Sequence, residues 1–110
     1  MQVAVLTAEL FFPGAGSLKD KRRRLSGLTA RIRASYPVSV AEVAHQDLWQ
    51  RGTIGVALVT TNSRLAQSML DRITEGIGRD GEVELLSRRI EWFRPEAIGE
   101  EGFPAEGGPE

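Results

Sequence analysis

Two stretches of the chain are apolar on both sides of an extended backbone, and this feature constrains the fold more than any other. They cover residues 2–12 and 53–61. Because successive side chains of a strand point to opposite faces of a sheet, these strands need cover on both faces, which is typical of the centre of a sheet. In the first stretch Ala4, Leu6, Ala8 and Leu10 lie on one side, and Val3, Val5 and Phe11 lie on the other. In the second stretch Ile54, Val56 and Leu58 lie opposite Ala57 and Val59, and the sequence does not decide which of these two sides faces the helices.

The first apolar strand is followed by a predicted helix over residues 18–35. A turn at Pro13 leads to Ser17, and Asp20 three residues later completes a pattern similar to a capping box. Pro37 ends the helix, because the residue before a proline avoids the helical region. The expected buried stripe is Leu18, Leu25, Leu28 and Ile32.

A second helix is predicted directly after residues 53–61. Asn62 or Ser63 can cap its start, and it closes near a glycine-containing segment at 78–81. Its expected buried stripe is Leu65, Met69, Ile73 and Ile77.

Two further strands complete the pattern. Residues 38–43 predict a short strand with a bulge near Ala41 and Glu42, and bulges favour the edge of a sheet. Residues 82–94 predict the last strand, in which the apolar phase changes between Leu85 and Leu86.

The order β-α-β-β-α-β favours an α+β, ferredoxin-like fold with a four-stranded antiparallel sheet and two helices on one of its faces. We expect one such domain over residues 1–94. The other face of the sheet stays open, and its central strands are apolar there. Monomers rarely expose so large an apolar patch, so we expect a homodimer, or another partner, on this face.

Charge and composition limit the location of the protein and the partners that it can bind. Cysteine is absent, no signal peptide opens the chain and no apolar run approaches the roughly 20 residues of a membrane span, so we expect a cytoplasmic protein without membrane contact. Residues 1–94 hold all fourteen basic residues against ten acidic ones. Residues 95–110 are acidic and rich in Gly and Pro, and we expect them to be disordered. They either form a solubilising tail without effect on binding or compete with polyanions for the basic domain.

The first helix carries the densest positive charge. Its start already has a positive dipole, so an anion there relieves repulsion, and the phosphates of RNA are suitable ligands. The alternative is a solvated surface of long side chains with no ligand. The central strands offer no aromatic residue for base stacking on the sheet, so we expect contacts to phosphates. The candidate RNA-binding residues are Lys19, Lys21, Arg22, Arg23, Arg24, Arg31 and Arg33.

The segment between the second and third predicted strands, at 38–43 and 53–61, holds a cluster of polar and aromatic residues. Only one histidine is present, which is too few for zinc without a second subunit, and no nucleophile is recognisable beside it. We expect no cofactor, no metal and no catalytic residue, and a hairpin held by Leu48 and Trp49. The residues of this segment with an open role are Glu42, His45, Gln46, Asp47 and Trp49.

Four segments resemble the YlxP-like family of bacterial proteins, which has no assigned function. They are Pro13–Arg23, Val38–Val43, His45–Arg51 and Gly55–Ala57, and the resemblance spans about residues 2–94. It implies a ferredoxin-like fold and a gene neighbourhood shared with transcription elongation factor NusA, translation initiation factor two and ribosome-binding factor A. It implies no catalytic residues. Ala44 stands where the resemblance leads us to expect an acidic residue.

These observations predict a small accessory factor of translation or ribosome maturation, not an enzyme, that binds RNA or a ribosomal surface through its first helix. Two alternatives remain open. One is a dimeric regulatory module that binds a small molecule at the sheet interface. The other is a metal-assisted enzyme that uses His45 and Glu42 across a dimer interface.

Overall fold

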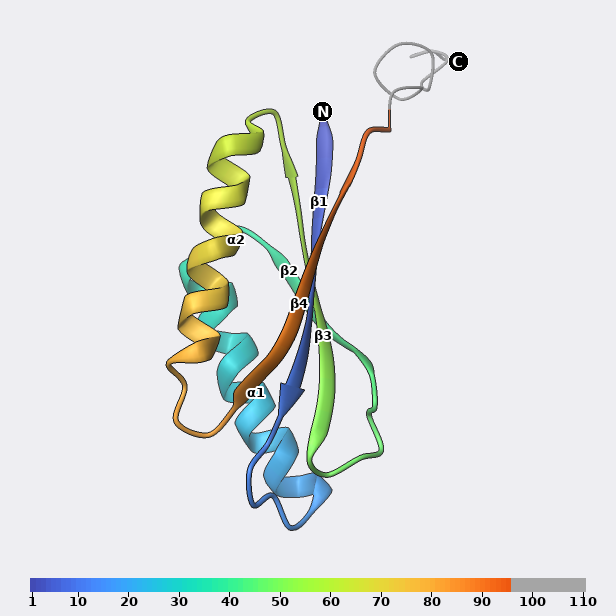
Figure 1. The fold of residues 1–110 in the computed structure, drawn as a ribbon, viewed down its shortest axis with the longest axis vertical. Coiled ribbons are helices and arrows are strands. Elements are labelled where there is room, and N and C mark those ends of the chain that lie inside the picture. Colours follow the sequence, from blue (N-terminus) through green and yellow to red (C-terminus); the bar gives the residue numbers. More distant parts are fainter. Residues whose placement is uncertain (96–110) are drawn as a thin grey trace, which may run out of the picture.

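A computed structural model describes residues 1–95 and has the predicted order of elements (Figure 1). The acidic segment expected to be disordered lies, from residue 96 on, outside the described residues. The elements are β1 Gln2–Phe11, α1 Leu18–Ser35, β2 Ser39–Ala44, β3 Arg51–Thr60, α2 Ser63–Gly78 and β4 Glu84–Phe93.

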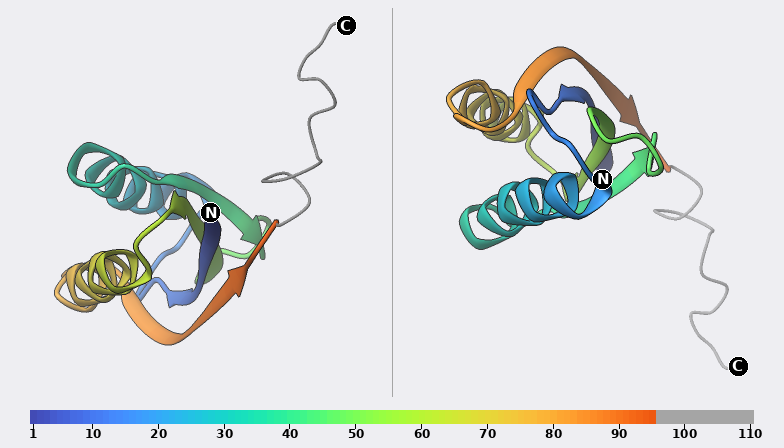
Figure 2. Two further views of the ribbon diagram at one scale, coloured as in Figure 1. Left: turned by 90° about the horizontal axis from the view of Figure 1, so that it is seen from above. Right: turned by 90° about the horizontal axis from the view of Figure 1, so that it is seen from below.

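The four strands form one antiparallel sheet in the order β2-β3-β1-β4. Both helices pack on the same face of this sheet (Figure 2), so the predicted ferredoxin-like fold is confirmed. The two apolar strands β1 and β3 are central, as predicted. The core lies between sheet and helices and includes Ala4, Leu6, Ala8, Leu10, Leu25, Leu28, Ile32, Ile54, Val56, Leu70, Ile73 and Ile77.

Both helix starts are capped as the sequence predicts. The Ser17 hydroxyl accepts a hydrogen bond from the backbone N–H of Asp20 at 3.0 Å. The Asn62 side chain accepts one from the backbone N–H of Leu65, also at 3.0 Å. Each cap satisfies a backbone donor that the helix itself leaves free, which fixes where α1 and α2 begin.

The predicted stripe of α2 was partly wrong. Leu65 is exposed and Met69 is only partly buried, whereas Ala66 and Leu70 are buried together with Ile73 and Ile77. Residues repeated every four positions drift around a helix of 3.6 residues per turn, whereas spacings of four, three and four stay in line. The buried stripe follows the second spacing.

Both edge strands contain a register shift. In β2 the shift falls between Glu42 and Ala44, one position later than expected. In β4 the residues paired with Leu10 and Glu9 are Leu85 and Ser87, so Leu86 is the extra residue. This bulge is the physical cause of the change of apolar phase in the sequence of the last strand.

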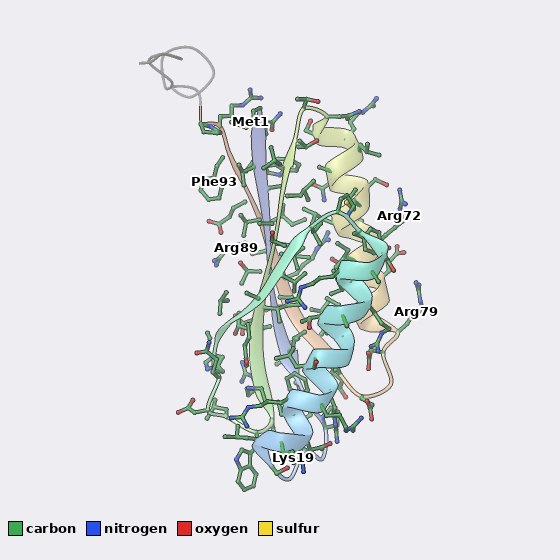
Figure 3. The ribbon with its side chains drawn as sticks, turned by 180° about the vertical axis from the view of Figure 1, so that it is seen from behind. Met1, Lys19, Arg72, Arg79, Arg89 and Phe93 are labelled. Atoms are coloured by element: carbon green, nitrogen blue, oxygen red, sulfur yellow. The ribbon has the colours of Figure 1, made fainter. Side chains whose placement is uncertain are left out.

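The face of the sheet away from the helices is open. Val59, Val43 and Phe93 have exposed fractions of 65%, 55% and 50%. Figure 3 shows Phe93 and Arg89 on this side. The register places Val3 opposite both Val59 and Phe93, so apolar side chains of three strands lie next to one another on this face.

Candidate nucleic-acid interface

On the flank of α1 that faces the β4 end of the sheet, the arginines form ion pairs and hydrogen bonds within the protein. Arg23 forms ion pairs with Asp20 and Glu82, both at 3.0 Å. Arg24 pairs with Asp20 at 2.9 Å and donates to the backbone carbonyl of Pro13 at 2.7 Å. These contacts fix the turn before α1 and the segment before β4 to the helix.

These pairs change the acidity of their members. The hydrogen bond from Arg23 holds the pKa of Asp20 below its usual value of 3.8, although partial desolvation opposes this. The hydrogen bond to Glu82 raises the pKa of Arg23 above its usual value. Both groups therefore stay charged at neutral pH, and each positive charge already has an anionic neighbour.

Arg31 is also engaged, since its guanidinium pairs with the carboxylate of Asp80 just beyond α2. Beside it lie Arg72 of α2 and Arg79, the residue directly after α2 (Figure 3). These two arginines were not predicted from the sequence, and they border a groove between the helices together with Arg31 and Tyr36. The signal was their spacing of seven, two turns of one helix face.

Lys21 was wrongly assigned to the RNA-binding surface. Its side chain is only 1% exposed, and its ammonium lies 2.8 Å from a carboxylate oxygen of Glu42. It also donates a hydrogen bond of 2.7 Å to the backbone carbonyl of His45. The helical pattern puts Lys21 in line with Leu25, so it points at the sheet, where a phosphate cannot reach it.

Three cations of α1 remain without an acidic partner in the described part of the chain: Lys19, Arg22 and Arg33. All three are exposed and share one line along the helix. Arg33 donates to the backbone carbonyl of Val40 at 2.7 Å, which places the line beside the edge strand β2. Figure 3 shows Lys19 at the start of this helix.

The segment between β2 and β3 is fixed at both ends to the region around the start of α1. The His45 carbonyl accepts hydrogen bonds from Lys21 and, at 3.1 Å, from the backbone N–H of Leu48. The Gln50 carbonyl accepts one from the backbone N–H of Phe12 at 2.9 Å. His45 has a φ of 63°, in the left-handed region that costs a non-glycine residue about 1–2 kcal/mol. Its two hydrogen bonds offset this strain.

The expectation that Leu48 and Trp49 hold this hairpin was wrong. Their exposed fractions are 44% and 52%, so the hairpin is held through its backbone and through Lys21 instead. Sequence could not distinguish the two arrangements, because an aromatic residue in a short loop fits either.

The polar residues of this segment do not converge. The carboxylate of Glu42 turns inward to Lys21, while Gln46 donates weakly to the Glu42 carbonyl at 3.4 Å. His45 and Asp47 are exposed. Within residues 1–95 no group of three His, Cys, Asp or Glu side chains could hold a metal ion, and no helix is long and apolar enough to cross a membrane.

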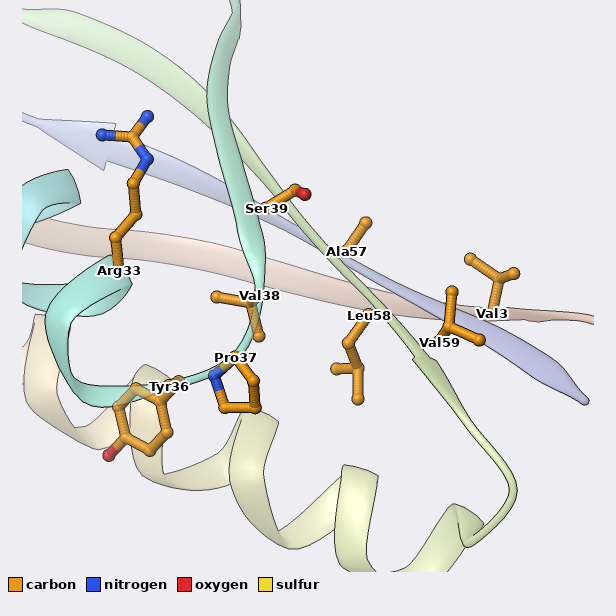
Figure 4. A pocket seen from close by; sticks show the side chains of 9 residues that line it. All are labelled: Val3, Arg33, Tyr36, Pro37, Val38, Ser39, Ala57, Leu58 and Val59. Carbon is orange, nitrogen blue, oxygen red and sulfur yellow. The ribbon is translucent and has the colours of Figure 1, made fainter.

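A shallow hollow of about 560 Å³ lies where the C-terminal end of α1 meets the sheet (Figure 4). Arg33 and Tyr36 approach it from the helix side, and Val3, Ala57 and Val59 come from the central strands. The hollow therefore joins the line of free cations to the open face of the sheet.

Comparison with known proteins identifies relatives without an assigned activity. Residues 3–90 match the family described as "Protein of unknown function (DUF503)". The "Uncharacterized protein YlxP" of Bacillus subtilis (strain 168) is 37% identical over 79 residues, which cover 72% of this chain and 86% of that protein.

Two solved structures of designed proteins match this chain over most of its length. "De novo designed protein Foldit4" matches with a TM-score of 0.50 and 12% identity, covering 86% of this chain and 98% of the other. A second design, LFR1 1 "with ferredoxin fold", has a TM-score of 0.43 and 14% identity over 83% of this chain and 85% of the other.

Proposed function

Since the chain belongs to the DUF503 family, whose function is unknown, its role must be inferred from its surface, and we propose that it binds RNA phosphates through α1 as a small accessory factor of translation or ribosome maturation. The observation that carries this proposal is the line formed by Lys19, Arg22 and Arg33, exposed and without acidic partners among residues 1–95. From Lys19 to Arg33 this line is roughly 20 Å long. That length is sufficient to contact several phosphates of one RNA strand.

The net charge of the domain supports the same ligand. Residues 1–94 carry fourteen basic and ten acidic side chains, and many of the acidic ones are consumed in ion pairs with specific arginines. The positive charge that has no acidic partner is therefore concentrated on the helical layer, where Arg72 and Arg79 add to the cations of α1. A one-sided positive field of this kind favours association with polyanions.

The assignment to translation or ribosome maturation has a different basis. It rests on the gene neighbourhood that the resemblance to the YlxP-like family implies, with an initiation factor and a ribosome-binding factor. Proximity of genes is an association and not a physical argument, so the RNA-binding surface is the part of the proposal that carries mechanism.

A triple variant in which three cations are replaced by neutral side chains tests the proposal. Replacing Lys19, Arg22 and Arg33 by Gln removes three phosphate contacts, so the logarithm of the affinity for single-stranded RNA should depend less steeply on salt, by about 2 units of slope. The matched control replaces Arg64, Arg88 and Arg94 by Gln, which removes the same charge away from this line and from the open sheet face. Equal losses in the two triple variants would show that only net charge matters and would contradict a specific surface on α1.

A small-molecule module remains the second candidate, favoured by the hollow in Figure 4. Its lining of apolar side chains with Arg33 and Tyr36 suits a compact anionic ligand. A ligand of this kind should raise the melting temperature of the protein in a screen of metabolites, whereas RNA should not. Replacing Tyr36 by Ala should abolish that shift.

A second copy of the chain is the proposed partner on the open sheet face. Arg89 and Glu91 lie side by side there, with Nε and Oε1 3.4 Å apart. In a two-fold arrangement the Arg89 of one copy can meet the Glu91 of the other, while Val59 and Phe93 supply apolar contact. The face is thus complementary to itself in charge and in hydrophobicity.

A further inference from the structure

We infer that Trp49 is a stacking platform for an unpaired nucleobase of the RNA, so that the ligand is single-stranded RNA rather than a duplex. This inference rests on the proposed RNA-binding function and specifies its substrate class. It starts from an observation that folding does not explain. The side chain of Trp49 is 52% exposed and the adjacent Leu48 is 44% exposed, in a short connection whose backbone is fixed.

The exposed pair adds little to the stability of the fold. Burial of a large apolar side chain is worth about 1.5–3 kcal/mol, and about half of each surface here stays in contact with water. Single exposed leucines are ordinary, but a tryptophan beside a leucine at the tip of a hairpin forms an apolar shelf. The two residues line a shallow hollow with Asp47, Gln50 and Arg51.

The shelf is held rigidly. The carbonyl of His45 before it accepts from Lys21 and Leu48, and the carbonyl of Gln50 after it accepts from Phe12. Because these hydrogen bonds fix both ends of the connection, Trp49 has little backbone freedom to lose when a ligand binds. A preorganised aromatic surface binds more tightly than a flexible one.

The shelf also lies at the end of the molecule where the positive line of α1 begins (Figure 1). Lys21, which holds the loop, belongs to the first turns of the helix, and Lys19 and Arg22 belong to the same turns. The turn before α1 and the β2–β3 connection are found at the same end of the molecule (Figure 1). An aromatic face next to cations is the arrangement that single-stranded nucleic acid requires, with bases on the ring and phosphates on the charges.

Polar groups around the ring can contact the edge of a stacked base. Gln46, Asp47 and Gln50 are exposed in the same connection and offer both amide donors and carboxylate acceptors. The carboxylate of Asp47 repels phosphates, so the backbone of the RNA should run on the side of α1. A base in a duplex cannot reach the ring, because its faces are already stacked.

The test uses fluorescence of Trp49 alone. The chain contains two tryptophans, so a Trp92→Phe protein reports only on Trp49. Titration with a single-stranded oligoadenylate should quench its fluorescence, and a blunt RNA duplex of the same length should not. Trp49→Leu should weaken binding of the single strand by about 10-fold or more, as expected from the loss of one stacked base. The matched control is Trp92→Leu, which changes the other exposed tryptophan and should leave the affinity unchanged.

The outcomes separate this inference from the function on which it rests. If the single strand binds and depends on Lys19, Arg22 and Arg33, but Trp49→Leu binds equally well, stacking is refuted and the phosphate surface stands. If neither RNA binds the wild-type protein, the proposed function itself fails. If Trp49→Leu keeps RNA affinity but loses a protein captured from lysate, the shelf is a protein docking site and the inference is overturned. Circular dichroism of each variant establishes that the fold is kept.

Discussion

The ammonium of Lys21 lies 2.8 Å from Oε2 of Glu42, and this buried ion pair joins α1 to the edge strand β2. The same ammonium holds the His45 carbonyl at 2.7 Å, so a single side chain connects a helix, a strand and the following loop. The ring of Phe12 lies 5.9 Å from it, within the range of a cation–π contact. Gly52 leaves room for this cluster, since a Cβ there would meet Phe12 at 3.1 Å. Three segments of the family resemblance, Pro13–Arg23, Val38–Val43 and His45–Arg51, thus contribute to one structural contact.

Breaking this pair should destabilise the protein more than removing it altogether. Lys21→Met leaves the carboxylate of Glu42 without its cation and the His45 carbonyl without a donor, and should lower the free energy of unfolding by roughly 3 kcal/mol. The double variant Lys21→Met, Glu42→Leu should recover a substantial part of this loss, because no uncompensated charge remains. Urea unfolding of the two single variants and the double variant measures the coupling. Strict additivity would show that the ion pair contributes nothing.

The backbone conformation of His45 predicts which substitutions at this position keep the stability of the protein. Because φ is 63° there, His45→Asn should be nearly neutral, and His45→Val should cost about 1–2 kcal/mol. Thermal unfolding of the two variants checks this order. A valine variant as stable as the asparagine variant would mean that the loop adopts another backbone conformation in solution.

Acid should weaken the fold through two carboxylates. Hydrogen bonds from Arg88 and Arg23 lower the pKa of Asp71 and of Asp20, respectively, below 3.8. Since the folded pKa lies below the unfolded one, the stabilisation is present above about pH 4 and is lost as the pH falls through the folded values. The double variant Asp20→Asn, Asp71→Asn should lose less stability than the wild type between pH 5 and pH 2. Asp47→Asn, which changes an exposed loop carboxylate, is the control and should follow the wild type.

The fold was predictable because its signals are local and repeated. Alternation along β1 and β3, the caps Ser17 and Asn62, and the end of α1 before Pro37 each follow from short-range rules, and they agree with one another. The bulge at Leu86 left a visible trace, because an extra residue reverses the apolar alternation of the strand. The stripe of α2 was displaced, since its apolar residues fit two spacings, and the bulge of β2 lies one position later than expected.

The candidate site was less predictable because the charge of a residue does not reveal whether its side chain is exposed or buried in an ion pair. The sequence places Lys21 and Arg22 next to each other with the same charge, but one is buried against Glu42 and the other is exposed. Which arginines find acidic partners depends on residues such as Glu82, 59 positions away from Arg23 in the chain. Pairings over that separation follow from tertiary structure, and no spacing within α1 reveals them.

The open sheet face predicts a dimer that one residue can dissociate. The sequence did not decide whether Val56 or Ala57 points outward. In the structure Val56 is fully buried in the core, while Ala57 pairs with Val5 and Ser39 on the open face. A carboxylate at Ala57 would therefore lie inside the proposed interface, where it has no partner and costs several kcal/mol.

Sedimentation velocity at micromolar concentration should show a wild-type dimer and an Ala57→Asp monomer that keeps the circular dichroism spectrum of the fold. Leu65→Asp is the matched control, because Leu65 is exposed on α2, away from the open face, and its exposed fraction of 55% leaves room for a carboxylate. This control should stay dimeric. A wild-type monomer at high concentration, or equal dissociation by both substitutions, would argue against pairing through the sheet, and the apolar side chains Val3, Val59 and Phe93 would then need another partner.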